Sequence, residues 1–159
     1  MHLTSIFGRL KMTLQSLFTE DQKKILLRNG EEENHFKNHI PVARLDIKKI
    51  GYSFLITELY EDRPDLAFAL CDYGTNIRCE VISLRQLSDL AKAKNGEIKP
   101  IEDFEGKYNL AVYAKVAAEI GTMIPEDDLF KNKFIKYDKG RNKDPNQDIR
   151  NLRSKLTWV

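Results

Sequence analysis

Four short segments in the middle of the chain carry the hydrophobic patterns of β-strands. In the first, Ala43, Leu45 and Ile47 alternate with the polar residues Arg44 and Asp46, as in a strand with one buried face. Short turns separate the segments, which predicts an antiparallel meander. The four segments are PVARLDI (41–47), YSFLITELY (52–60), LAFALCDY (66–73) and IRCEVIS (77–83), and the third is apolar enough to be a central strand.

Helical spacing of apolar residues appears on both sides of these strands. Leucine, isoleucine and phenylalanine recur at helical spacing over residues 14–29, with Thr19 available as a cap if a helix starts there. Ser83 is placed to cap a helix over residues 84–94, and Asn109 to cap one over 109–121 that Gly121 ends. Between the last two helices, residues 97–108 predict a fifth, edge-type strand interrupted by Pro100.

These elements predict an α+β fold in one domain. We expect an antiparallel meander of four to five strands, an N-terminal helix, and two helices packed on one face of the sheet. Hydrophobic residues make up 42% of the 159, which is enough for one core and excludes a wholly disordered chain. The expected organisation is an N-terminal extension (1–13), a single domain (14–121) and a basic C-terminal tail (122–159).

Cysteine usage and hydropathy indicate a cytoplasmic protein. Cys71 and Cys79 are too few to staple a fold, and their spacing matches no common zinc or redox motif. Burial of Cys71 in an apolar strand predicts a raised thiol pKa and low reactivity. No apolar run approaches the roughly 18 residues of a membrane span, and residues 1–18 make a poor secretion signal.

Positive charge is concentrated at the C-terminal end. The whole chain carries a formal charge of only +2, but residues 129–155 hold nine Lys or Arg against three Asp, while residues 1–121 hold 17 basic and 18 acidic residues. Basic residues interleaved with aromatic ones suit phosphate pairing and base stacking. The candidate binding residues are Lys131, Lys133, Phe134, Lys136, Tyr137, Lys139, Arg141, Lys143 and the anchor Trp158.

Two sets of side chains could form a catalytic or metal site, and each set also has a purely structural explanation. Glu58, Asp72 and Glu80, with Asp65 near them, lie at or near strand ends, where carboxylates can hold Mg²⁺ and act on phosphodiesters. Turn capping and surface ion pairs are the favoured explanation, because Asp65 and Asp72 suit turns for ordinary reasons and Glu58 and Asp72 are expected more than about 10 Å apart. The second set is His35 and His39, whose spacing would suit zinc on a helix, but the segment lacks an HExxH glutamate and a polar loop is the favoured interpretation.

Several of these segments resemble domain-of-unknown-function family 2958, an uncharacterised bacterial family found in plasmid, phage and conjugative-element neighbourhoods. The resemblance covers roughly residues 20–121, and the family's usual glycine is replaced by Ala69. It implies a fold and a genomic context but no reaction. It is carried by LLRNG, Pro41 to Leu45, Thr57-Glu58-Leu59, Pro64-Asp65, Ala67 to Gly74, Glu80, Ser83 to Leu87 and Tyr113-Ala114.

We therefore expect a mobile-element accessory protein that works by binding. The leading hypothesis is a non-catalytic module, without metal or cofactor, that contacts nucleic acid or a nucleic-acid-handling protein through the tail. One alternative is a metal-dependent nuclease or other hydrolase that uses Glu58, Asp72 and Glu80. Another, by analogy of context alone, is an inhibitor of a host defence system.

Overall fold

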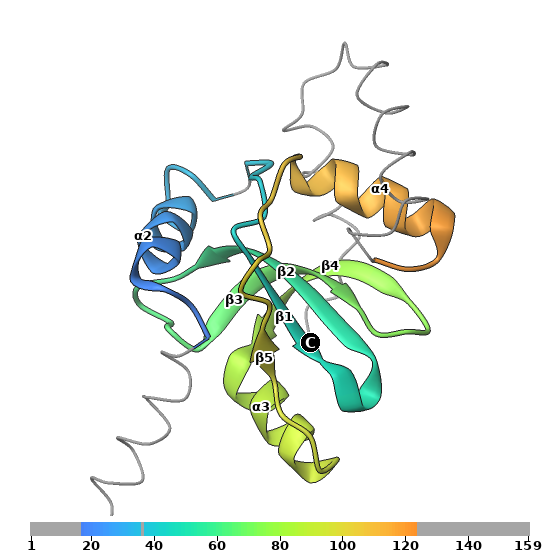
Figure 1. Ribbon diagram of the computed structural model, residues 1–159. Coiled ribbons are helices and arrows are strands. Elements are labelled where there is room, and N and C mark those ends of the chain that lie inside the picture. Colours follow the sequence, from blue (N-terminus) through green and yellow to red (C-terminus); the bar gives the residue numbers. More distant parts are fainter. Residues whose placement is uncertain (1–16, 36, 124–159) are drawn as a thin grey trace, which may run out of the picture.

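Five strands form one antiparallel sheet in a computed structural model that describes residues 17–35 and 37–123 (Figure 1). Their order across the sheet is β4-β3-β2-β1-β5, so the first four make the predicted meander. The α+β class and the antiparallel sheet are thereby confirmed. The strands are β1 (Ala43–Ile47), β2 (Tyr52–Leu59), β3 (Leu66–Asp72), β4 (Ile77–Ser83) and β5 (Lys99–Pro100).

The fifth strand is much shorter than predicted, and it lies at the far edge of the sheet from β4. It pairs Lys99 and Pro100 with β1 rather than extending along residues 97–108. The Ile101 amide still donates to the Arg44 carbonyl at 2.9 Å, and the chain leaves β1 after that bond. The chain reaches this edge by crossing the sheet through a helix, so β5 does not continue the meander.

Three helices of the described residues accompany the sheet: α2 (Glu20–Asn29), α3 (Leu84–Ala93) and α4 (Leu110–Ile120); a short 3₁₀ turn, η1 (Lys48–Ile50), joins β1 to β2. The first begins at Glu20, because Thr19 and Gln22 form a reciprocal capping box. Thr19 Oγ1 accepts the Gln22 amide at 3.1 Å, and Gln22 Oε1 accepts the Thr19 amide at 2.9 Å. Of the predicted range, residues 14–16 lie outside the described residues, as does the extension 1–13.

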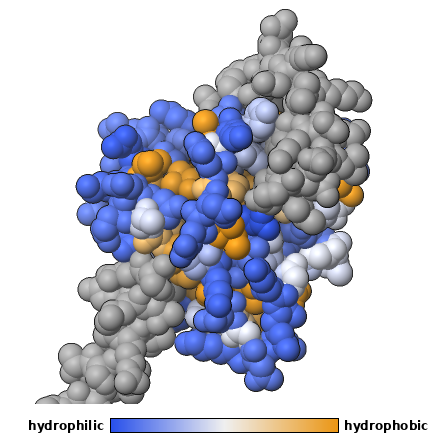
Figure 2. Space-filling model, in the orientation of Figure 1, coloured by the Kyte–Doolittle hydropathy of each residue, from blue (hydrophilic) through white to orange (hydrophobic). Residues whose placement is uncertain are grey.

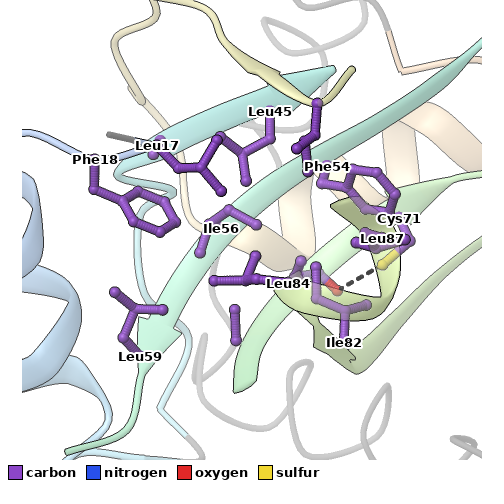
Figure 3. Close-up of a cluster of buried hydrophobic side chains, with 14 of the residues drawn as sticks. Leu17, Phe18, Leu45, Phe54, Ile56, Leu59, Cys71, Ile82, Leu84 and Leu87 are labelled. Atoms are coloured by element: carbon purple, nitrogen blue, oxygen red, sulfur yellow. Dashed lines mark hydrogen bonds between the residues drawn. The ribbon is translucent and has the colours of Figure 1, made fainter. Parts of the chain in front are cut away.

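One face of the sheet is covered by α2 and α3. Figure 3 shows Phe18 and Leu84 packed with Ile56 in a cluster that also includes Phe54 of β2. A second cluster forms on the opposite face, where residues of α4 pack on Leu55, Phe68 and other strand side chains. The sheet is therefore the middle of three layers.

This placement of α4 differs from the expectation that the two later helices would share one face. The reason is visible in β2 and β3, whose consecutive positions are buried: Phe54 faces α3 while Leu55 faces α4. A strand that is apolar on both faces needs a cover on each side. The core also continues past the expected domain end, because Met123 is only 1% exposed and packs with α4.

Two close backbone contacts set the positions of the segments around α2. A Cβ atom added to Gly30, at the end of α2, would lie 1.8 Å from the carbonyl oxygen of Leu59 at the end of β2. One added to Gly106 would lie 2.0 Å from the carbonyl oxygen of Pro41. Neither site has room for a side chain, so glycine is required for these segments to touch.

We expect Gly30→Asn to lower the free energy of unfolding by about 1–3 kcal/mol, because the helix end must move off β2. The matched control is Gly51→Asn, at a left-handed position with φ +70° and nothing within 4 Å of an added Cβ. Asparagine tolerates that conformation, so the control should change little. Urea unfolding of both variants measures the difference. Equal losses would show that the contact at Leu59 does not constrain the fold.

Candidate functional site

A groove of about 550 Å³ opens between α2 and two loops. Ile25 and Asn29 of α2 line one side, residues 38–42 line the second, and Phe104 to Gly106 with Asn109 line the third. Ile25 and Ile40 are 43% and 46% exposed, which is unusual for isoleucine beside a hollow. On the face drawn in Figure 2, hydrophobic side chains surface beside α2 among hydrophilic ones.

The lining of this groove has one carboxylate, Glu105, and is acidic rather than basic. Three asparagines, His39 and Glu105 supply its polar groups, and neither Lys nor Arg contributes to it. Such a surface suits an apolar or amide-bearing ligand and offers no cation to a phosphate. Sequence reasoning missed this groove, because its three walls come from segments up to about 80 residues apart and none has a motif of its own.

Behind the groove, Glu58 is completely buried, with 0% of its surface exposed. The Tyr60 hydroxyl donates to its Oε2 at 2.8 Å. His39 Nε2 lies 3.9 Å from its Oε1 and 2.9 Å from the carbonyl oxygen of Asn34. A buried carboxylate requires such partners, since its desolvation is costly.

A β-bulge puts Glu58 on this face. The pairing of β2 with β3 shifts register between Ile56 and Glu58, so Glu58 lies opposite Phe68, whose side chain packs with α4. In a regular strand Glu58 would share the face of Phe54 and Ile56, which α2 and α3 cover. A local irregularity of this kind has no clear mark in the sequence.

Asp72 and Asp65 act as acceptors for backbone amides. Asp72 accepts the amide of Gly74 at 2.8 Å and the amide of Met123 at 3.0 Å, which holds the chain after α4 to the end of β3. Asp65 accepts the Arg85 amide at 2.9 Å in the first turn of α3. The turn-capping interpretation therefore accounts for both side chains.

The cap of α4 also comes from a distant residue. Asn109 occupies the N-cap position, but its side chain makes no capping hydrogen bond. Instead, Asn38 Oδ1 accepts the Ala111 amide at 3.0 Å, and the His39 carbonyl accepts the Leu110 amide at 2.9 Å. The expected local cap is thus replaced by one from the loop before β1.

Glu80 lies on the other face of the sheet, opposite Ala69. It accepts a hydrogen bond from the Tyr73 hydroxyl and pairs with Arg78 at 3.0 Å. Burial is the main reason that the pKa of Tyr73 is raised above its ordinary value. Glu80 therefore belongs to a small surface network of Arg78 and Tyr73.

The structure does not bring the three carboxylates into one site. Glu80 is on the opposite face from Glu58 and Asp72. Asp72 pairs with Ser53, five residues from Glu58 along β2, which at about 3.3 Å per residue is roughly 16 Å. Among the described residues, no three His, Cys, Asp or Glu side chains are grouped so that they could hold a metal ion.

The two histidines and the two cysteines are likewise held apart. His35 lies in a turn and His39 in the extended segment before β1, so no helix presents them together. Cys71 and Cys79 are buried, form no disulfide and belong to the clusters on opposite faces. Burial raises the pKa of Cys71 well above its ordinary value, as predicted, and its thiol donates to the Ala69 carbonyl (Figure 3).

The predicted binding residues of the tail, from Lys131 to Lys143 and Trp158, lie outside the described residues. Their role stays a prediction from sequence. In the part of the chain that is described, none of the helices has the length and apolar character needed to cross a bilayer.

Comparison with known proteins identifies a family. Residues 17–124 match the family described as protein of unknown function (DUF2958), and this is more than half of the chain. No curated protein and no solved structure matches the chain. The chain belongs to the DUF2958 family, as the resemblance of its motifs indicated.

We expect Asp72→Asn to lower the free energy of unfolding by about 1–3 kcal/mol. An amide keeps one acceptor oxygen but turns an NH₂ group toward the second backbone donor, which loses its partner. Asp89→Asn is the matched control, because Asp89 is exposed on α3, and it should change stability by no more than about 0.5 kcal/mol. Chemical denaturation of both variants measures this. Unchanged stability in Asp72→Asn would contradict the capping role.

Proposed function

We propose that this member of the DUF2958 family is a non-catalytic binding module that contacts nucleic acid through its basic C-terminal segment. The observation that carries the proposal is the separation of charge along the chain. Residues 129–155 hold nine Lys or Arg against three Asp, whereas residues 1–121 are nearly balanced. A polyanion is the partner that such a segment attracts most strongly.

The described side chains support a binding role over a catalytic one. Asp65 and Asp72 serve as acceptors for backbone amides, and Glu80 is engaged by Arg78 and Tyr73. Glu58 is fully buried. A metal-dependent hydrolase using these carboxylates gains no support, because they lie on two faces of the sheet and far apart along β2.

The sequence of the basic segment suggests how each kind of residue would contribute. Its lysines and arginines would pair with phosphates, and Phe134 or Tyr137 would stack on unpaired bases. Aromatic stacking favours single strands, whose bases are accessible. We therefore propose single-stranded nucleic acid as the preferred form, with little dependence on base sequence.

Polarised fluorescence of labelled oligonucleotides tests this in the full-length chain. We expect replacement of Lys131, Lys133, Lys136 and Lys139 by Gln to weaken binding roughly tenfold or more and to reduce the salt dependence of the affinity. The matched control replaces four exposed lysines of the folded domain, Lys48, Lys49, Lys92 and Lys94, by Gln. It removes the same charge and should leave most of the affinity.

Three results would overturn the proposal. One is the absence of salt-sensitive binding by the unmodified chain, which would leave the basic segment without a nucleic-acid role. Another is an equal loss of affinity in both quadruple variants, which would show that only net charge matters. Cleavage of the oligonucleotide in Mg²⁺ that Asp72→Asn abolishes without loss of stability would support the hydrolase instead.

A further inference from the structure

The groove beside α2 combines exposed apolar side chains with a hollow large enough for aromatic rings. Ile25 of α2 and Ile40 of the facing loop are 43% and 46% exposed, and Pro41 and Phe104 add further apolar lining. The volume of about 550 Å³ lies within the range of pockets that bind ligands, roughly 300–1,000 Å³. Apolar side chains that remain exposed around a hollow are typical of a surface that another segment covers.

The two loops that supply the other walls of this groove are acidic. Residues 31–42 and 101–109 carry six Asp or Glu against two Lys, and all six carboxylates are exposed. Among the described residues, no lysine or arginine forms an ion pair with any of these six. A groove with an apolar lining and acidic flanks attracts a segment that carries both aromatic and basic residues. The carboxylates are Glu31, Glu32, Glu33, Glu102, Asp103 and Glu105.

Residues 131–139 of this chain have the composition that the groove would attract. Their sequence, KNKFIKYDK, holds four lysines against one aspartate, with Phe134 and Tyr137 between the lysines. These residues lie outside the described part of the chain. Their charge is opposite to that of the loops around the groove, and their aromatic rings match its apolar lining in size and polarity.

The intervening chain is long enough for this segment to reach the groove. Asn109 precedes α4 and lines the groove, and Met123 follows the other end of that helix. At 1.5 Å per residue, the 11 residues of α4 are about 16 Å long. Residues 124–133 span up to about 33 Å when extended, roughly twice that length. A short tether also keeps the segment near the groove at an effective concentration of roughly millimolar order.

We propose that residues 131–139 dock in this groove of the same chain, with Phe134 and Tyr137 against its apolar lining and the lysines against the acidic loops. The consequence for nucleic acid rests on the proposed function. A docked segment has neither its aromatic rings nor its lysines available for bases and phosphates, so the groove and the nucleic acid compete for it. A segment docked about 90% of the time would lower the apparent affinity for nucleic acid roughly tenfold.

Amide NMR of the full-length chain, without nucleic acid, tests the docking itself. Gly106 and Asn109 line the groove, so we expect their ¹H–¹⁵N signals to move when Phe134 and Tyr137 are both replaced by Ser. Trp158→Ser is the control, because it removes an aromatic ring outside residues 131–139 and should leave both signals in place.

Three results would overturn the docking. One is unchanged signals of Gly106 and Asn109 in the double variant, and another is an equal shift in Trp158→Ser. The third is a shift that grows with protein concentration, since the groove would then take the segment of a second copy.

The affinity of the full-length chain for a labelled oligothymidine strand tests the competition. Ile25→Lys removes an apolar contact and sets a positive charge in the groove, so release of the segment should tighten binding about fivefold or more. Leu27→Lys is the matched control, because Leu27 is 37% exposed on the same helix but does not line the groove. It adds the same charge and should change the affinity by less than about twofold.

The docking and the proposed function can fail separately. Equal affinities of the two lysine variants would overturn the competition. Unmoved amide signals overturn the docking whatever the chain binds. Moved signals in a chain that binds no nucleic acid would support the docking and overturn the proposed function instead.

Discussion

Three polar side chains, Asn38, Asp65 and Asp72, fasten the helices of this protein to its sheet. Each accepts a backbone amide from a segment far away in the sequence: Asn38 from the start of α4, Asp65 from the start of α3, and Asp72 from the chain that follows α4. Hydrogen bonds to charged groups such as Asp65 and Asp72 contribute roughly 1.5–3 kcal/mol each, and one to a neutral acceptor such as Asn38 contributes about 0.5–1.5 kcal/mol. Leaving the buried amide of Ala111 or Met123 without its acceptor would cost about 1–3 kcal/mol. The three-layer arrangement depends on these contacts, because both α3 and α4 begin at them.

The sequence was sufficient to predict the strands and helices, but not to predict which face of the sheet each helix covers. Alternation in 41–47, the apolar third strand and the Ser83 cap predicted β1, β3 and α3, because these signals arise from neighbouring residues. The helix covering each face could not be predicted in this way. It depends on both faces of β2 and β3 being apolar, and a continuous apolar run marks a central strand without showing which helix covers which face. The bulge at Thr57 and the cap from Asn38 arise from tertiary contacts, and local patterns do not carry them.

The distinction between local sequence patterns and tertiary contacts also applies to the assignment of function. Carboxylates near strand ends are compatible with either catalysis or capping, and only the structure shows that Asp65 and Asp72 meet backbone amides. The lining of the groove beside α2 has no Lys or Arg, so the folded domain offers a surface for apolar or amide groups while the positive charge lies in the segment that follows it.

Native-state hydrogen exchange tests the fastening of helices to sheet most directly. The amides of Ala111 and Met123 have side-chain acceptors, Asn38 and Asp72, in separate parts of the chain. If these contacts hold the layers together, both amides should exchange as slowly as those of the β2–β3 ladder and only through global unfolding. Rapid exchange at Ala111 and Met123 while the ladder stays protected would contradict the account, because α4 would then detach from an intact sheet.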